Sequence, residues 1–162
     1  MTKLIGVLLG ITLLAGCGTE KSATSAADPD AVLSAIHEVE NFQIDAITRR
    51  DLRSATNIYT PNVQFHIPGS GLDTGREEIF RRLEDMLADE SYDLQIDSGS
   101  RQSWVANSGD LAATGFSGNM TRTETGKPVT FPMINRTIWV KQHDGSWQID
   151  SDINTRLSMP SK

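Results

Sequence analysis

The second half of the chain, from Tyr92 to Asn154, contains no convincing helical pattern, and it constrains the fold more than any other stretch. Runs of strand-like composition alternate there with turn sequences. Asp144-Gly145, between two such runs, is among the stronger local hairpin signals. A sheet of strands this long must bury one face, so the first half of the chain is expected to cover it. The strands are predicted at residues 94–106, 111–123, 129–142 and 147–154.

The first half supplies helices with the pattern that such a cover needs. Apolar residues recur at helical spacing from Val32 to Ile47, and Asp28-Pro29 is typical of a helix start. Shorter amphipathic helices are predicted over residues 52–59 and 79–87, with a strand at 63–67 between them. The order of helix, helix, strand, helix and four strands predicts an α+β fold, with the helices on one face of an antiparallel sheet.

The N-terminal segment has the layout of an export leader. Met1-Thr2-Lys3 is followed by an uncharged apolar run that is too short to span a bilayer. This run ends in Leu14-Ala15-Gly16-Cys17, which resembles the lipobox of bacterial lipoproteins. The resemblance implies a signal peptide at residues 1–16, a lipid on Cys17 and a flexible tether at residues 17–29. An ordinary leader that is cut nearby, with loss of Cys17, is the alternative.

The lipoprotein resemblance implies a domain on the outer side of a bacterial membrane, bound to it through the Cys17 lipid. The outer membrane is expected if the host has two, because no Asp follows Cys17. The predicted domain spans residues 30–157, and residues 158–162 form a tail. The formal net charge of −6 and the lack of a basic run argue against a nucleic-acid partner. Because Cys17 is the single cysteine, no intramolecular disulfide is possible.

Four segments, in their order and spacing, resemble the SnoaL-like and ketosteroid-isomerase-like branch of the nuclear transport factor 2-like superfamily. The resemblance implies a cystatin-like fold, a cone-shaped half-barrel whose curved sheet wraps round the first long helix and leaves a pocket at its wide end. Members include ketosteroid isomerases, polyketide cyclases, dehydratases and proteins without a known reaction, so function has to be argued from the pocket residues. The segments are residues 60–69, 75–79, 109–112 and 139–149.

The resemblance also points away from ketosteroid isomerisation. In those isomerases the general base is an Asp directly before the proline that ends the first strand, and here that position is Ile67. The Tyr expected midway along the first helix is missing too, since Phe42 and Gln43 stand there. That mechanism depends on a positioned base and on a donor aimed at the developing enolate, so it is not expected here.

Two other residues are the candidates for acid–base chemistry, His66 and Asp152. Strand alternation places His66 opposite its apolar neighbours, on the outer face of the sheet. The same alternation places Asp150 and Asp152 together, on the face opposite Ile149 and Ile153. A solvated or subunit-facing surface is the expectation for this pair, and paired catalytic carboxylates are the alternative.

A ligand pocket is predicted from polar residues on otherwise apolar faces. Gln43 interrupts the apolar stripe of the first helix, and a buried amide must find a partner or a ligand. Asn135 and Arg136 are neighbours in a strand, so one of them points inward. Bulky apolar side chains would form the walls, although core packing alone also explains them. No metal-ligand spacing is present, and no cofactor is expected. The predicted pocket residues are Phe42, Gln43, Trp104, Met120, Met133, Asn135 and Arg136.

Two classes of function follow from the sequence. The first is a membrane-tethered, noncatalytic module that binds an apolar small molecule or assembles, as a homodimer through the outer face of the sheet. The second is a small-molecule enzyme of the polyketide-cyclase, dehydratase or isomerase type. The lack of a clustered set of acid, base and donor in the sequence favours the first class. The cone interior discriminates between them, because an open pocket with His66 or an Asp beside Asn135 or Arg136 favours catalysis.

Overall fold

The computed structural model describes residues 27–158. The predicted signal peptide, Cys17, most of the tether and the end of the tail lie outside the described residues. The helices are α1 (Pro29–Thr48), α2 (Leu52–Thr56) and α3 (Arg76–Ala88). The strands are β1 (Tyr59–His66), β2 (Leu72–Thr74), β3 (Asp93–Ile96), β4 (Gln102–Val105), β5 (Leu111–Glu124), β6 (Lys127–Lys141) and β7 (Trp147–Arg156).

The strands form one sheet in the order β2-β1-β7-β6-β5-β3, and β4 also pairs with β5. The expectation of an antiparallel sheet is wrong at one place, where β1 runs parallel to β7. The hairpins β5–β6 and β6–β7 are antiparallel, as their turn sequences predict. The first strand, however, joins the sheet from the helices rather than through a hairpin with β7, and a strand that arrives in this way is free to run parallel. The sheet is therefore mixed.

The segment predicted as one strand at residues 94–106 is divided in two. Strand β3 pairs with the second half of β5 and β4 with its first half, and the break between them lies at Asp97–Arg101. Within that break, Gly99 has a positive φ of 75°. Two short strands that follow one another along the same edge of β5 allow the sheet to bend between them. Gly118 allows the close approach of β3, because a Cβ at this position would lie 2.3 Å from the Gln95 carbonyl oxygen.

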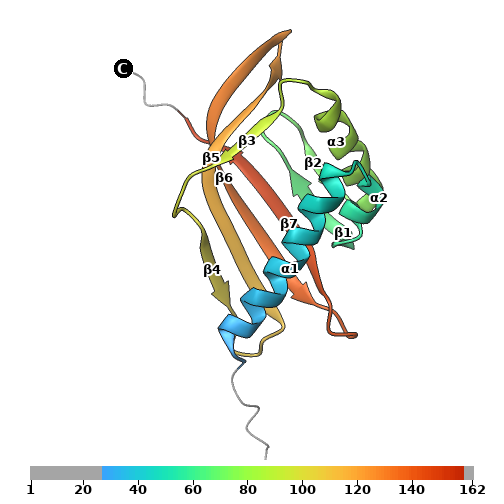
Figure 1. The fold of residues 1–162 in the computed structure, drawn as a ribbon, viewed down its shortest axis with the longest axis vertical. Helices are drawn as coiled ribbons and strands as arrows, with labels where there is room; N and C mark the ends of the chain where they lie inside the picture. The colour runs from blue at the N-terminus through green and yellow to red at the C-terminus, as the bar shows by residue number, and fades with distance from the viewer. Residues whose placement is uncertain (1–26, 159–162) are drawn as a thin grey trace, which may run out of the picture.

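The helices cover one face of the sheet. Figure 1 shows α1 lying across the long strands, with α2 and α3 beside it near β1 and β2. Helix α1 starts as predicted, with Asp28 as the N-cap that accepts a hydrogen bond from the Asp30 amide and with Pro29 in the first turn. No helix among residues 27–158 is long and apolar enough to cross a membrane.

Two apolar clusters fill the space between helices and sheet. The larger one joins Ile36 of α1 and Ile79 of α3 to Tyr59, Trp139 and Ile149 on the sheet. The smaller one is formed by Met120, Phe131 and Met133, toward the other end of β5 and β6. Members of the larger cluster and Phe116, which packs on the smaller one, line a common cavity, and this cavity is the natural place to look for a site.

Candidate functional site

A cavity of about 380 Å³, called here the central cavity, lies between α1 and the strands β3 to β7. Ile44 of α1 and Ile96 of β3 line it and are exposed, so the cavity opens to solvent between these two elements. Its inner wall contains Trp139 and Ile149, both almost fully buried. The polar side chains that line it come from several elements and include Gln43 of α1, Asn135 of β6 and Asp152 of β7.

A β-bulge brings Asp152 to the inside of the sheet. Trp139 pairs with Ile149 and Ile138 pairs with Ser151, so Asp150 is an extra residue without a partner on β6. Beyond the bulge the alternation is shifted by one residue. The expected outward position of Asp152 beside Asp150 is therefore wrong, because uniform alternation does not hold across the extra residue. Asp150 does face outward, where its carboxylate accepts a hydrogen bond from the Thr60 hydroxyl.

Two neutral donors hold the Asp152 carboxylate. The side-chain amide of Asn135 donates to Oδ1 at 2.8 Å, and the Tyr59 hydroxyl is 3.3 Å from Oδ2. Burial raises the pKa of Asp152 to about 6, although these hydrogen bonds act in the opposite direction and lower it. No cation contributes to this shift among the described residues. A carboxyl group with this pKa changes its protonation state close to neutral pH.

Neighbouring side chains fix the orientation of the Asn135 amide. The Thr137 hydroxyl donates to its Oδ1 at 3.0 Å, so Oδ1 is the acceptor and Nδ2 carries the hydrogens. Nδ2 then donates both to Asp152 and to Oδ1 of Asn154. Asn135, Thr137 and Asn154 are buried, and each is therefore held by its hydrogen bonds rather than by solvent. The donor to Asp152 is thus pre-organised.

Tyr59 connects Asp152 to the first helix. Gln43 Nε2 donates to the Tyr59 hydroxyl oxygen at 3.0 Å, which explains the amide in the apolar stripe of α1. Burial, and then the nearby Asp152 charge, raise the pKa of Tyr59 well above its usual value. Tyr59 therefore keeps its proton and acts as a donor at any physiological pH.

A second carboxylate lines the solvent side of the central cavity. Glu40 of α1 lies 3.8 Å from Arg101, which ends the turn between β3 and β4. Burial raises the pKa of Glu40, and the charges of Arg101 and His37 oppose this shift. The polar groups near the opening thus differ from the deeper site, because they include a cation.

The hydroxyl of Thr114 in the cavity wall has a free hydrogen. Thr114 Oγ1 accepts from Trp139 Nε1 at 2.9 Å, and no acceptor for the hydroxyl hydrogen of Thr114 is found among residues 27–158. Thr114 lines the central cavity, so this hydrogen is available to a bound molecule.

A smaller cavity of about 170 Å³, called here the inner compartment, adjoins the central cavity. Four residues line both spaces: Gln43, Ile47, Leu94 and Asp152. Asp152 therefore lies at the boundary between the two spaces.

The structure brings together only some of the predicted pocket residues. Gln43 and Asn135 line the central cavity together with Asp152, and Met120 lines the inner compartment. Of the pair on β6, Asn135 points inward, while Arg136 is exposed and donates to the backbone oxygen of Asn135.

The other predicted pocket residues lie elsewhere. Phe42 is 49% exposed and borders a hollow on the far side of α1, because the stripe that faces the cavity passes through Gln43 and Ile47. Trp104 is 56% exposed on β4. Met133 is fully buried within the smaller apolar cluster and lines neither cavity.

His66 is held at the edge of the site. Its Nδ1–H donates to the backbone oxygen of Asn154 at 2.8 Å, and the Asn154 side-chain amide donates back to the His66 carbonyl oxygen. His66 lines neither the central cavity nor the inner compartment, whereas Phe65 and Ile67 line the inner compartment, as strand alternation predicts. His66 thus fastens β1 to β7 and does not face the ligand space.

Sequence reasoning missed Tyr59, Thr137 and Asn154. The apolar pattern of residues 52–59 predicts a helix that includes Tyr59, whereas in the structure Tyr59 begins β1. Thr137 and Asn154 lie at inward positions that only the bulge and the register of β6 against β7 define. One signal was present, since Asn135 and Thr137 share one face of their strand with the apolar residues Met133 and Trp139.

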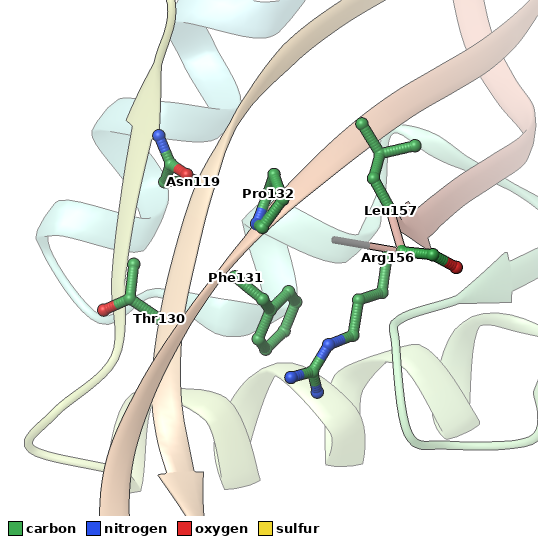
Figure 2. Close-up of a pocket in the computed structure, with 7 residues that line it drawn as sticks. Asn119, Thr130, Phe131, Pro132, Arg156 and Leu157 are labelled. Atoms are coloured by element: carbon green, nitrogen blue, oxygen red, sulfur yellow. The ribbon is translucent and has the colours of Figure 1, made fainter. Parts of the chain in front are cut away.

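A larger hollow, of about 630 Å³, lies near the C-terminal end of β7 (Figure 2). Of its lining residues, Arg156 is the charged one. Its guanidinium lies 4.1 Å from the centre of the Phe131 ring and also pairs with Glu124. This cation is already engaged, and the described residues in the wall of the hollow include no carboxylate, histidine or cysteine. Among residues 27–158, no group of three or more His, Cys, Asp or Glu side chains is arranged to hold a metal ion.

Comparison with solved structures identifies the fold. A nuclear transport factor 2-like superfamily protein from Salmonella enterica superposes with a TM-score of 0.64 and 18% identity, covering 83% of this chain and 96% of that one. A proposed dehydratase of the nuclear transport factor 2-like family from Streptomyces avermitilis gives 0.62 and 18%, covering 80% and 99%. A ketosteroid isomerase-like protein from Erwinia carotovora atroseptica gives 0.62 and 20%, covering 78% and 97%.

These identities are too low to transfer an activity, but the α+β nuclear transport factor 2-like fold is confirmed. No curated protein matches the sequence. The family model of the SnoaL-like domain matches residues 39–147, more than half of the chain and all of the elements from the middle of α1 to the start of β7. The chain belongs to the SnoaL-like domain family.

Proposed function

We propose that this domain binds a small, largely apolar molecule in the central cavity and that Asp152 transfers a proton to or from it. One observation carries the proposal: a carboxyl group with a pKa near 6 faces an apolar-walled cavity and is held there by two neutral donors. Groups with a pKa close to the working pH are the most effective general acids and bases. A carboxyl group perturbed mainly by burial in a cleft is a typical candidate for such a role.

The arrangement supports proton removal next to a carbonyl group. The ionised Asp152 takes a proton from the carbon beside a ligand carbonyl, and the electron pair of that C–H bond moves to the carbonyl oxygen. The free hydroxyl hydrogen of Thr114 is available to that oxygen. The protonated Asp152 then returns its proton, either to another carbon, which isomerises the ligand, or to a departing hydroxyl group, which releases water.

The location of the base distinguishes this site from the ketosteroid isomerase pattern. Ile67 occupies the position of the isomerase base and lines the inner compartment as part of its apolar wall. Asp152 instead approaches from the last strand, and Tyr59 approaches it from β1. The proposal therefore does not require the residues that this chain lacks.

Hydrogen exchange tests the proposal without knowledge of the natural substrate. A panel of cyclic ketones and 1,3-diketones is incubated with the protein in D₂O, and loss of the hydrogens beside the carbonyl group is followed by NMR. The exchange rate catalysed by the wild type should rise with pH around pH 6, because only the ionised Asp152 accepts a proton.

The matched control uses the neighbouring acid of the same strand. D152N should abolish exchange above the buffer rate, whereas D150N should retain it, because Asp150 faces away from the cavity. Equal exchange by D152N and the wild type would contradict the proton-transfer role.

Binding without a reaction is the second candidate function. It is favoured by Ile67 at the position of the isomerase base and by the exposure of Ile44 and Ile96 at the opening, which suits capture of an apolar molecule. Panel compounds that bind in the cavity, with no exchange above the buffer rate, would support this function instead.

The proposal also includes a membrane anchor at Cys17. The described part of the chain begins at Ala27, whose backbone N–H donates to the Asn107 oxygen in the turn between β4 and β5. The ten residue-to-residue steps from Cys17 to Ala27 span at most about 35 Å when extended, so the lipid would hold the domain close to the bilayer. The C17A variant should appear in the soluble exported fraction, and its continued extraction with membranes would contradict the anchor.

The homodimer remains part of the proposal as well. Trp104 of β4 and Ile138 of β6 are both exposed, and both pair with the same residue of β5. They lie on the face of the sheet opposite Trp139. Sedimentation of the domain should give twice the monomer mass, and I138K should reduce it to that of a monomer. A wild-type monomer at high concentration would contradict the dimer.

A further inference from the structure

The inner compartment is lined mainly by apolar side chains. Its walls come from α1, α3 and the strands β1, β3, β5 and β7, and Asp152 is the only charged side chain among its described lining residues. Phe65 and Tyr59 pack edge to face with ring centres 6.2 Å apart, which fixes one side of the space. Leu83 and Met86 of α3 also line the space. A space of this kind favours an apolar group of a bound molecule and disfavours a charged one.

The volume of the inner compartment sets the size of the group that fits. An apolar cavity of about 150 Å³ in a protein core takes up benzene, and the inner compartment has about 170 Å³. Met86 and Met120 in its wall are flexible enough to adapt to a flat ring or to a compact branched alkyl group. A long straight chain would exceed this space.

The two adjoining spaces differ in chemistry on the two sides of Asp152. On one side lies the apolar inner compartment. On the other side the central cavity leads past Thr114 to the Glu40 and Arg101 pair near the solvent opening. A molecule that fills both spaces must have an apolar end and a polar end, and the atoms between these ends pass beside Asp152.

We propose that the ligand of this domain carries a compact apolar group of about the size of a benzene ring, that this group fills the inner compartment, and that the reacting carbon lies next to it, beside Asp152. The polar remainder of the ligand occupies the central cavity. The inference rests on the proposed proton transfer only for the place of the reacting carbon, since the fit of the apolar group depends on the inner compartment alone.

Two probes with the same carbonyl group test the fit. Acetophenone carries a ring beside its methyl ketone, and acetone carries only a methyl group in that place. Binding is followed by NMR of protein labelled at the methionine methyl groups, because Met86 and Met120 line the inner compartment. Acetophenone should bind at least about tenfold more tightly than acetone and shift both methyl signals, as expected from the burial of a ring.

Filling the inner compartment should remove this preference. M86F adds a ring to the wall and should weaken acetophenone binding about tenfold without weakening acetone binding, whereas the control M86L keeps the space open. L87F, on a second residue of the same wall, provides the same test if M86F does not fold. Equal acetophenone binding by a folded filled variant and the wild type, or no acetophenone binding by the wild type, would overturn the inference.

The two proposals fail in different ways. Suppose that D152N loses hydrogen exchange and that M86F and L87F bind acetophenone as tightly as the wild type. This result would refute only the placement of a ring-sized group in the inner compartment. Acetophenone binding that these variants block, together with unchanged exchange in D152N, would refute only the proton transfer and leave the inner compartment as the binding site for an apolar group.

Discussion

The strand pair β6 and β7 has two different halves on the two sides of the bulge at Asp150. Before the bulge, Trp139 lies opposite Ile149, and both are nearly inaccessible to solvent. After the bulge, Thr137 lies opposite Asp152 and Asn135 lies opposite Asn154. The same two strands thus contribute a buried apolar wall at one end and a hydrogen-bonded polar cluster at the other.

The difference shows how one additional residue creates a site within a stable sheet. The apolar half is packed under α1 and provides the stability on which the polar half depends. The polar half contains the buried carboxylate, whose position is unfavourable for folding but useful for chemistry. Variants that act on only one half test this division.

The largest effect is expected in the apolar half. W139A removes an indole that is 1% exposed and breaks its hydrogen bond to Thr114, so the free energy of unfolding should fall by about 3 to 5 kcal/mol. Urea denaturation followed by circular dichroism measures this change. A loss smaller than about 1 kcal/mol would mean that Trp139 does not belong to the stabilising core.

The opposite sign is expected for D152N in the polar half. Because the pKa of Asp152 in the folded protein, about 6, lies above its ordinary value of 3.8, folding favours the neutral form. The contribution of Asp152 to stability is therefore fully present below about pH 4 and is lost as the pH rises through 6. D152N should be more stable than the wild type by about 2 kcal/mol at pH 7.5, and the difference should shrink toward pH 4.

The exposed acid of the same strand is the control for this measurement. D150N should not be more stable than the wild type at pH 7.5, because Asp150 faces outward and its carboxylate accepts a hydrogen bond from the Thr60 hydroxyl. A stability difference between D152N and the wild type that does not change with pH would show that Asp152 is not a buried titrating group.

A smaller effect is expected for N135L, which removes one donor to Asp152. The hydrogen bond from Asn135 lowers the pKa of Asp152, so its loss should move the titration midpoint upward by about one unit. NMR of the ¹³C-labelled carboxyl group measures the midpoint. A downward shift or an unchanged midpoint would show that Asn135 does not stabilise the charged form.

The smallest effect is expected for F42A, on the face of α1 that points away from both cavities. Phe42 is half exposed, so the free energy of unfolding should change by less than about 1 kcal/mol, and acetophenone binding should be unchanged. Weaker acetophenone binding by F42A would instead place this ring at the ligand.

Local signals explain the parts of the fold that could be predicted from the sequence. Asp28-Pro29 marks the start of α1, and Asp144-Gly145 marks the turn before β7, because capping and turn chemistry depend on neighbouring residues. The α+β layout follows from the order of the elements. The parallel pairing of β1 with β7 could not be predicted in this way, since it joins residues about 90 positions apart.

The site was harder to predict because one residue changes the alternation. Ile149 and Ile153 are separated by four positions, which kept the pattern outwardly regular and concealed the bulge between them. Uniform alternation along this strand therefore predicts an outward position for Asp152. Asn135 and Gln43 are recognisable in the sequence as polar residues on apolar faces. Their contacts with Asp152 are long-range and could not be predicted: Asn135 bonds to it directly, and Gln43 bonds to it through Tyr59.

The hydrogen bonds around Asp152 also determine in which direction its proton can be transferred. Asn135 can only donate to Oδ1 in its fixed orientation, and Gln43 already donates to the Tyr59 oxygen, which disfavours acceptance of another hydrogen there. Neither Asn135 nor Tyr59 therefore offers a good acceptor to a proton that Asp152 has taken up. Its most favourable destination is the open side of the carboxyl group, so the cluster that anchors the base also returns the proton to the ligand.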